Sequence, residues 1–359
     1  MDIKQTLIGF KEEFDAELLN FIKNKQAEAN KLDKRYQVFI DLLEDYIIRG
    51  GKRLRPAFMY FGYISCGGKE RKKIIKAARC VELLQAFLLM HDDIIDKSNL
   101  RRGRPTIHRM FESEHQELKL KGDREHFGRS TAMILGDLTH AFAYETLMES
   151  GFEDLLLVRA RRLFDNLMFE TAYGWYVELL GTNGSKAGER EIKRTMEYVS
   201  ARYTIAGPLK LGATLAGAEK KVLKSLDKFG VKLGTAFQMQ DDILGMFGSE
   251  EKVGKPVDSD FREGKKTLLL IQTLAKMKAK KLYGEIDRVL KIYGCNEATL
   301  DDYLWFRGRM LDLGVLDNIK KEALSLAGQA RDELSGLRLA REGKVFLEEV
   351  AWYMVEREV

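Results

Sequence analysis

Apolar residues recur at helical spacing along nearly the whole chain. The clearest segment runs from Ile74 to Asp96, contains no Gly or Pro, and is apolar on almost all sides. A helix that is apolar all round belongs in a protein core, so the pattern predicts a deeply buried helix that ends in carboxylates. Similar patterns predict helices at about 128–150, 154–181, 189–218, 219–247, 265–293, 298–312 and 315–335, and from about Glu342 to the C-terminus.

The breaks between these segments are short and lie at residues 66–70, 181–185 and 248–260. A charged stretch from Glu112 to Glu125 is expected to form an exposed loop or a frayed helix. The chain has no Gly/Ser-rich or Pro-rich linker, no low-complexity tract and no repeat of fixed period. These features predict an all-α protein with a single domain over residues 1–359, whose motifs lie within about 50–270.

Composition supports long helices around a large core. The chain has 359 residues, of which 45% are hydrophobic, and only 4 are proline. So few helix breakers favour long helices over many short strands. Lys and Arg number 60 against 55 acidic residues, a net charge of +5 that is too small to indicate a nucleic-acid partner.

Cysteine usage and hydropathy bear on location. Cys66, Cys80 and Cys295 are widely spaced and odd in number, which is typical of a reducing cytosol. No apolar run approaches the ~20 residues needed to cross a bilayer. The N-terminus carries acids among its apolar residues and is expected to be an amphipathic helix, not a signal peptide. We therefore expect no transmembrane segment and a cytoplasmic protein.

The strongest local signal is HDDIID at the end of the predicted buried helix. Asp92 and Asp96 are four residues apart, so their carboxylates lie on one face of the helix, one turn apart. Oxygen ligands on a rigid frame suit Mg²⁺, which takes its remaining ligands from water and substrate phosphates. The simpler alternative is a helix end that exposes its acids to solvent.

A second acidic cluster, Asp241 and Asp242, follows Gln238 and Gln240 in FQMQDDILG. Alone it is a weak signal, because paired aspartates are common on helix surfaces. Together with the first cluster, it suggests two acidic walls that face each other across a cavity. Such walls would hold a diphosphate through several metal ions.

Basic residues gather next to glycine turns and acidic helix ends. Each alone is more often a solvated charge than a ligand, but Arg and Lys both bind phosphate well. The candidates are Lys52, Arg53, Arg55, Arg101, Arg102, Lys255, Lys265 and Lys266. Carboxylates for metals and separate basic clusters together predict two negatively charged substrate groups.

Other chemistries find no support in the sequence. There is no Ser/His/Asp set, nucleophile elbow or GxxxxGK[ST] phosphate loop, which argues against acyl transfer and P-loop chemistry. The 5 histidines have no metal-ligand spacing, and we expect His91 to be structural or supporting.

In its motifs the chain resembles the trans-isoprenyl (polyprenyl) diphosphate synthases, in particular the short-chain, archaeal-like type that makes geranylgeranyl or farnesyl diphosphate. The resemblance spans about Gly50 to Leu270 and is carried, in order, by GGKRLRP, VELLQAFLLMHDDIIDKSNLRRGRPT, HFGRSTAMILGD, FQMQDDILGMFG and GKPVDSDFREGKKTLLL. It implies an all-α barrel of helices around a central cavity, a homodimer, and about three Mg²⁺ ions per active site.

The resemblance also implies roles for individual residues. Asp92, Asp96 and Asp241 match the Mg²⁺ ligands, with Asp93 in support. Contacts to isopentenyl diphosphate match Lys52, Arg55, Gln85 and Arg102. Contacts to the allylic diphosphate match Arg101, Gln238, Lys255 and Lys265, and Lys255 is also expected to act in catalysis.

The implied reaction is ionisation, condensation and elimination. Mg²⁺ draws the diphosphate from the allylic substrate (dimethylallyl, geranyl or farnesyl diphosphate), isopentenyl diphosphate attacks the cation, and a proton leaves. Relatives with aromatic residues at the positions of Phe87 and Leu88 tend to stop at C15, and those with only the earlier one tend toward C20. This chain has Phe87 then Leu88, so we predict geranylgeranyl diphosphate as the product, with farnesyl diphosphate as the alternative.

Two positions depart from the family pattern. Gly245 stands where a DDxxD motif would have its third aspartate, and activity is expected to survive because Asp241 is the principal ligand. The family's usual Lys-Thr pair falls on Val199 and Ser200, which leaves Ser200 as a substrate-binding candidate and a phosphate-binding lysine missing. Arg202, further along the same helix, is a candidate replacement.

Three alternatives remain open. A non-catalytic homologue that binds prenyl diphosphates should have lost an aspartate motif, and this chain keeps both. A class I terpene cyclase would not need GGKRLRP. A structural helical scaffold would leave the clustered charges unexplained.

Overall fold

The computed structural model describes residues 2–182, 188–248, 258–295 and 297–356. Helices dominate these residues, and the only strands within them are β1 (Leu100–Arg101) and β2 (Arg104–Pro105), which pair antiparallel. The all-α prediction is confirmed.

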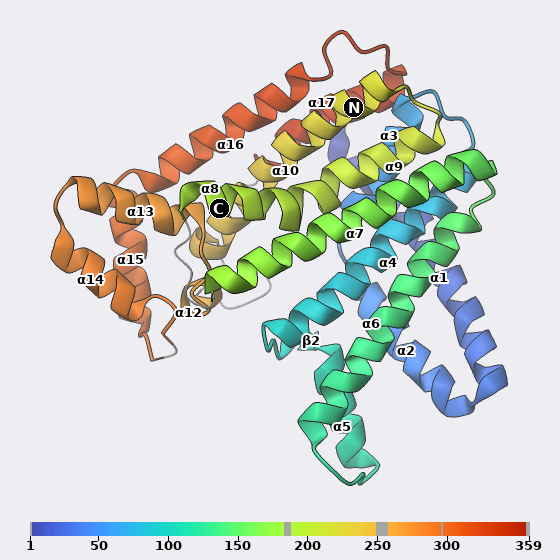
Figure 1. Cartoon of the computed structure of the whole chain (residues 1–359), viewed down its shortest axis with the longest axis horizontal. Coiled ribbons are helices and arrows are strands. Elements are labelled where there is room, and N and C mark those ends of the chain that lie inside the picture. Colours follow the sequence, from blue (N-terminus) through green and yellow to red (C-terminus); the bar gives the residue numbers. More distant parts are fainter. Residues whose placement is uncertain (1, 183–187, 249–257, 296, 357–359) are drawn as a thin grey trace. The chain divides into compact units, whose positions relative to one another are not determined.

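The chain forms two compact units, and Figure 1 labels most of their helices. The N-terminal unit comprises residues 2–161 and 211–217, and the C-terminal unit comprises residues 162–210 and 218–359. Helices α7 (Asp154–Thr182) and α9 (Gly207–Leu215) are each divided between the two units. The expectation of a single domain stays a prediction.

The N-terminal unit packs its helices around α4 (Arg71–Ile95). Helices α1 (Ile3–Leu32), α3 (Leu54–Ser65), α5 (Ile107–Glu117) and α6 (Arg124–Met148) contact α4, and α2 (Lys34–Ile48) packs on α1. Side chains of α4 are buried at every position from Ala77 to Leu88, as the apolar pattern predicts. Gly136 of α6 lets the two helices approach closely, because a Cβ there would lie 2.6 Å from His91 Nε2.

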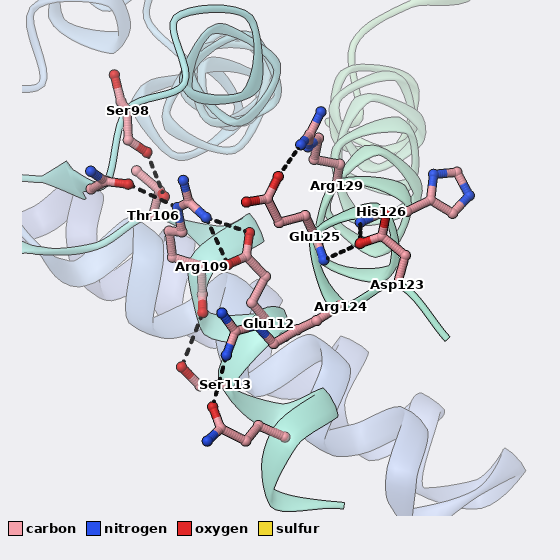
Figure 2. Close-up of polar contacts among 12 residues, drawn as sticks. Ser98, Thr106, Arg109, Glu112, Ser113, Asp123, Arg124, Glu125, His126 and Arg129 are labelled. Carbon is pink, nitrogen blue, oxygen red and sulfur yellow. Dashed lines mark hydrogen bonds and ion pairs between the residues drawn. The ribbon is translucent and has the colours of Figure 1, made fainter. Parts of the chain in front are cut away.

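The charged stretch from Glu112 to Glu125 is in part the expected exposed loop, at residues 118–123, and is helical on either side of it. Helix α5 extends to Glu117, and α6 begins at Arg124 with Asp123 as its N-cap. Phe111 and His115 of α5 are buried, and the half-buried Arg109 pairs with the buried Glu112 (Figure 2). The helix forms because this narrow apolar face packs on α6, and charges occupy the other positions.

The C-terminal unit centres on α10 (Lys220–Phe247), which packs against a π-helix, η1 (Met196–Ala206), and against α16 (Val315–Asp332). Small residues allow α10 and η1 to touch: Cβ atoms on Gly230 and Gly234 would lie 2.4 Å from the Cα atoms of Ala206 and Ala201. Because π-helical bonds join residues five apart, Ala201 and Ala206 share one face of η1. The π-helix therefore matches the glycine spacing of α10.

The remaining helices of this unit are α8 (Glu189–Thr195), α12 (Ser259–Arg262), α13 (Leu268–Ala279), α14 (Tyr283–Ile292), α15 (Leu300–Asp312) and α17 (Arg341–Tyr353). They match the predicted segments, except α12, which begins within the expected break at 248–260, and the pair α13 and α14. The single helix expected at 265–293 was wrong, because the chain breaks between α13 and α14. Lys281 has a φ of 58°, a left-handed conformation that ends a helix.

Candidate active site

The first acidic cluster stands at the C-terminal end of α4 and divides into two parts. Asp96 is exposed and Asp92 is half-buried, whereas Asp93 is fully buried. Tyr46 of α2 donates a hydrogen bond from Oη to Asp93 Oδ2 at 2.9 Å. The two carboxylates predicted to hold metal are thus the accessible ones, and the aspartate between them is a structural anchor.

Arg101 ties this cluster to the β-hairpin. Its Nε donates to Asp93 Oδ1 at 2.7 Å, and its Nη2 lies 3.1 Å from Asp92 Oδ2. Burial raises the pKa of the Asp93 carboxyl, and the Arg101 guanidinium acts against that rise by favouring the ionised form. Arg101 therefore lies beside a predicted metal ligand, where the resemblance places a contact to the allylic diphosphate.

The GGKRLRP segment forms a tight turn before α3. Gly50 and Gly51 have φ values of 104° and 125°, which glycine adopts without strain. Arg102 donates from Nη1 to the carbonyl of Gly50, and a Cβ on Gly51 would lie 3.0 Å from Arg102 Nη2. The turn thus requires glycine at position 51 because of its positive φ, and the Arg102 guanidinium packs close beside it.

The three cations of this segment differ in exposure. Lys52 is exposed and Arg55 is half-buried in the first turn of α3, but Arg53 is only 4% exposed. The sequence groups Arg53 with its neighbours as a phosphate-binding cation. The structure corrects this, because the Arg53 guanidinium is enclosed by protein groups on every edge.

The N-terminal unit brings the predicted acidic and basic residues together. Arg101 reaches Asp92 and Asp93, while its neighbour Arg102 reaches the glycine turn beside Lys52. Gln85, two helical turns before Asp92 on α4, is 9% exposed, and its Oε1 has no hydrogen-bond partner. A buried acceptor of this kind is available to a ligand or a water molecule.

The second acidic cluster, in the C-terminal unit, has a similar division. Asp241 is half-buried, whereas Asp242 is 6% exposed and accepts a hydrogen bond from Gln238 Nε2 at 2.9 Å. Lys265 Nζ lies 3.5 Å from Asp242 Oδ1. Burial raises the pKa of Asp242, and Lys265 opposes this. Gln238 and Lys265 thus hold the inner aspartate beside the predicted metal ligand Asp241.

Gly245, the departure from DDxxD, lies against another carboxylate. A Cβ at this position would stand 2.4 Å from Oδ2 of Asp260, a residue that is 5% exposed. Asp260 also lies close enough to Lys265 and Asp242 to influence the pKa of both. Lys255, predicted to bind the allylic diphosphate, lies outside the described residues.

The suggestion that Arg202 replaces the missing lysine is wrong on geometric grounds. Arg202 Nη2 lies 2.6 Å from Glu197 Oε1, and Nη1 lies 3.8 Å from Asp227 Oδ1. Asp227 precedes Asp241 on α10 by 14 residues, which is about 21 Å along a helix. Arg202 therefore belongs to a separate ion-pair cluster, far from the second acidic motif.

Val199 and Ser200 also point into protein. A Cβ on Gly174 of α7 would lie 2.8 Å from Val199 Cγ2, so Val199 packs against α7. Ser200 is 6% exposed. Within the described residues, neither position offers a cation where the family has its lysine.

The predicted chain-length residues are both buried. Phe87 is 7% exposed and stacks on His140 of α6, with ring centroids 4.8 Å apart and planes at 17°. His91 contacts the same ring edge-on at 4.6 Å. Leu88 is 2% exposed. His91 is thus a packing partner of Phe87, and the role of Phe87 and Leu88 in product length stays a prediction.

Several site residues carry no pattern that singles them out in the sequence. Asp93 is held by Tyr46, and Arg53 is held by Glu82 and Asp15, in each case from a helix distant in the chain. Asp260 lies inside the quoted GKPVDSD motif, so the motif itself could have identified it.

The aspartates fit a divalent metal that arrives with its substrate. Within the part of the chain that the structure describes, no group of three or more His, Cys, Asp or Glu side chains could hold a metal ion. Mg²⁺ usually takes one or two carboxylates and completes its shell with water and phosphate oxygens. The accessible Asp92 and Asp96, on one helix face, supply such a partial set of ligands.

Comparison with known proteins identifies the class. Residues 37–300 match the polyprenyl synthetase family, and the chain belongs to that family. The prenyltransferase activity predicted from the sequence is thereby confirmed. A search of the described residues finds no helix with the length and apolar character needed to span a bilayer.

Within this family, the chain is similar to several proteins named as geranylgeranyl diphosphate synthases. The chain is 32% identical over 310 residues to a geranylgeranyl diphosphate synthase of Methanosarcina mazei, covering 86% of each. It is 34% identical over 257 residues to that of Sulfolobus acidocaldarius, covering 71% of each. A geranylgeranyl pyrophosphate synthase of Corynebacterium glutamicum, solved with isoprenyl diphosphate and magnesium, matches with a TM-score of 0.92 and 28% identity over 100% of both chains.

Proposed function

We propose that this protein condenses isopentenyl diphosphate with dimethylallyl, geranyl and farnesyl diphosphates, and that geranylgeranyl diphosphate is its main product. The observation that carries the proposal is the link between Arg101 and Arg102. One side chain reaches the acidic end of α4 and the next reaches the glycine turn. Adjacent sites for a metal-bound diphosphate and a cation-bound diphosphate are what the two-substrate reaction needs.

The allylic diphosphate would bind at the acidic clusters. Asp92, Asp96 and Asp241 would hold Mg²⁺, with three ions per site. Bound there, Mg²⁺ supplies positive charge that stabilises the departing diphosphate. Arg101, fixed by Asp93, and Lys265, fixed by Asp242, add cations that need no rearrangement as charge develops.

Isopentenyl diphosphate would bind at the glycine turn. Lys52, Arg55 and Arg102 supply the cations, and Gln85 offers a buried acceptor nearby on α4. The double bond of isopentenyl diphosphate attacks the allylic cation. The resulting cation then loses a proton to the departing diphosphate. Apolar walls formed by residues such as Phe87 and Leu88 would exclude water that could quench the cation.

Product length is supported by two lines of evidence. Phe87 precedes Leu88 on α4, the order associated with C20 products, and several relatives at about 30% identity or more are geranylgeranyl diphosphate synthases. A geranylfarnesyl diphosphate synthase of Aeropyrum pernix is also 30% identical over 315 residues. The next longer product is therefore the one to look for beside geranylgeranyl and farnesyl diphosphate.

We also propose a homodimer. Two helices expose large apolar side chains, with Met133 and Ile134 on α6 at 43% and 61% exposed, and Phe169 and Tyr176 on α7 at 78% and 62%. Exposed apolar groups of this size favour burial against a second subunit. The cytoplasmic location predicted from the sequence stays a prediction.

The test is pyrophosphate release by the purified protein. With isopentenyl and farnesyl diphosphates, release should require Mg²⁺, stop in EDTA and return when Mg²⁺ is restored. Asp92→Asn should lower the rate by about 10²–10³ while leaving the fold intact. Release that is independent of isopentenyl diphosphate, or full activity in EDTA, would refute the proposal.

A further inference from the structure

The loop that presents the glycine turn, Gly50–Arg55, is held in an unusual conformation; we term it the substrate loop. Besides the two glycines, Arg53 has a φ of 48°, in the left-handed region that non-glycine residues rarely adopt. A backbone of this kind costs free energy and persists only where surrounding contacts fix it. The contacts that fix Arg53 therefore determine where Lys52 and Arg55 lie.

Three helices each supply a hydrogen-bond acceptor to the Arg53 guanidinium. Nε donates to Asp15 Oδ1 on α1 at 2.6 Å, Nη1 donates to Glu82 Oε1 on α4 at 2.5 Å, and Nη2 donates to the Ile47 carbonyl of α2 at 2.9 Å. The fork of an arginine holds a fixed geometry when all its edges are bonded. Arg53 thus pins the loop to three helices at once.

Of the two carboxylates, Asp15 comes from outside the family match, which begins at residue 37. Its helix α1 packs on both α3 and α4, and Lys11 pairs with Asp15 from the adjacent turn. Glu82 also influences the nearby Arg102, so it is shared between two cations. Each carboxylate thus serves two cations, and Asp15 is the one that joins the Arg53 guanidinium to α1.

We propose that Asp15 is a positioning residue for isopentenyl diphosphate, acting through Arg53 on the substrate loop; this rests on the proposed function of the site. Without the Asp15 charge, Arg53 keeps Glu82 and the Ile47 carbonyl but loses its contact with α1, and the loop no longer fixes Lys52 and Arg55 at one spacing. Affinity for the substrate bound by the loop should fall, while the acidic clusters keep their geometry.

A matched control lies on the same helix. Glu17 pairs with Arg79 Nη1 at 3.2 Å, and its side chain is 26% exposed against 22% for Asp15. Arg79 also stacks over Phe21 of α1, 4.8 Å from the ring centroid. This pair anchors α1 to α4 without touching the substrate loop, so Glu17→Gln removes a comparable charge and leaves the loop alone.

The experiment compares Asp15→Asn, Asp15→Glu and Glu17→Gln by steady-state kinetics and thermal unfolding. Asp15→Asn should raise the KM for isopentenyl diphosphate about ten- to a hundredfold, the scale of a small misplacement of binding groups. The KM for farnesyl diphosphate should stay unchanged. Asp15→Glu, which keeps the charge, should recover part of the loss, and Glu17→Gln should lower only the melting temperature.

Two outcomes would overturn the inference. The first is an Asp15→Asn variant with a lowered melting temperature, as in Glu17→Gln, and both KM values unchanged. The second is an equal rise of both KM values. Either result makes Asp15 structural only. If Asp15→Asn does not fold, the KM for isopentenyl diphosphate in Asp15→Glu decides, and an unchanged value contradicts the role. A wild-type protein without prenyl transfer would refute the proposed function instead.

Discussion

Gly245 lies directly against the carboxylate of Asp260, and a Cβ at position 245 would stand 2.4 Å from Asp260 Oδ2. Asp260 is 5% exposed and lies near the buried Asp242 and the half-buried Lys265. The chain thus has a buried carboxylate at the place where a DDxxD motif has its third aspartate side chain. Glycine at 245 is a packing requirement here.

Gly245→Ala should therefore destabilise the protein by about 1–3 kcal/mol, the usual cost of overpacking a core. Gly9 on α1 is the control, because a Cβ there meets nothing within 4 Å. Gly9→Ala should stabilise by about 0.5–1 kcal/mol, since alanine suits a helix better. Denaturant unfolding measures both, and equal effects of the two substitutions would contradict the close contact.

Arg202→Ala should affect stability and leave substrate binding unchanged. Arg202 balances Glu197, Glu170 and Asp227, and its removal leaves Lys210 as the remaining basic side chain paired with Asp227. The expected cost is about 1–3 kcal/mol in the free energy of unfolding. The KM for farnesyl diphosphate is the second measurement. A raised KM in Arg202→Ala would show that Arg202 binds the diphosphate after all.

His108 should make stability depend on pH. It is 3% exposed, its Nδ1 has no hydrogen-bond partner, and burial lowers its pKa below the usual value. The unfolded chain then binds a proton near pH 6.5 that the folded protein does not, so stability falls as the pH drops from 7 through that range. Melting temperatures at pH 7 and 5.5 should differ less in His108→Asn than in the wild type. An equal difference in the two proteins would show that His108 is not the source of the pH dependence.

Phe87 and Leu88 should set the product length. Phe87→Ala removes the ring that stacks on His140 and meets His91 edge-on, and longer products than those of the wild type are expected. Leu88→Phe adds bulk one turn below Asp92 and should shorten the product. Chromatography of radiolabelled products separates these cases. An unchanged product distribution in Phe87→Ala would mean that other residues close the cavity.

The helical pattern predicts most of the fold because apolar spacing decides which face of each helix is buried. It fails where a few contacts outweigh composition. In the stretch from Glu112 to Glu125, residues 116–125 are exposed as expected, but the first residues are helical because Phe111 and His115 are buried. The break at Lys281 follows a run of good helix formers, and the apolar spacing does not mark it.

For the site, the motifs locate the reacting groups but not their partners. Lys52 and Arg53 are neighbours in the sequence with the same charge, yet Lys52 is exposed and Arg53 is buried. The difference arises from Asp15 and Glu82, which are 38 and 29 residues away from Arg53. Such long-range pairs leave no periodic signal in the sequence.

The central claim is that the two diphosphate sites join an allylic chain to isopentenyl diphosphate and stop at C20. The most direct measurement supplies labelled isopentenyl diphosphate and Mg²⁺ with C5, C10 or C15 primers, then sizes the dephosphorylated products. We predict geranylgeraniol as the main product from all three primers. No incorporation of label, or products that stop at the primer plus one unit in every case, would contradict the account.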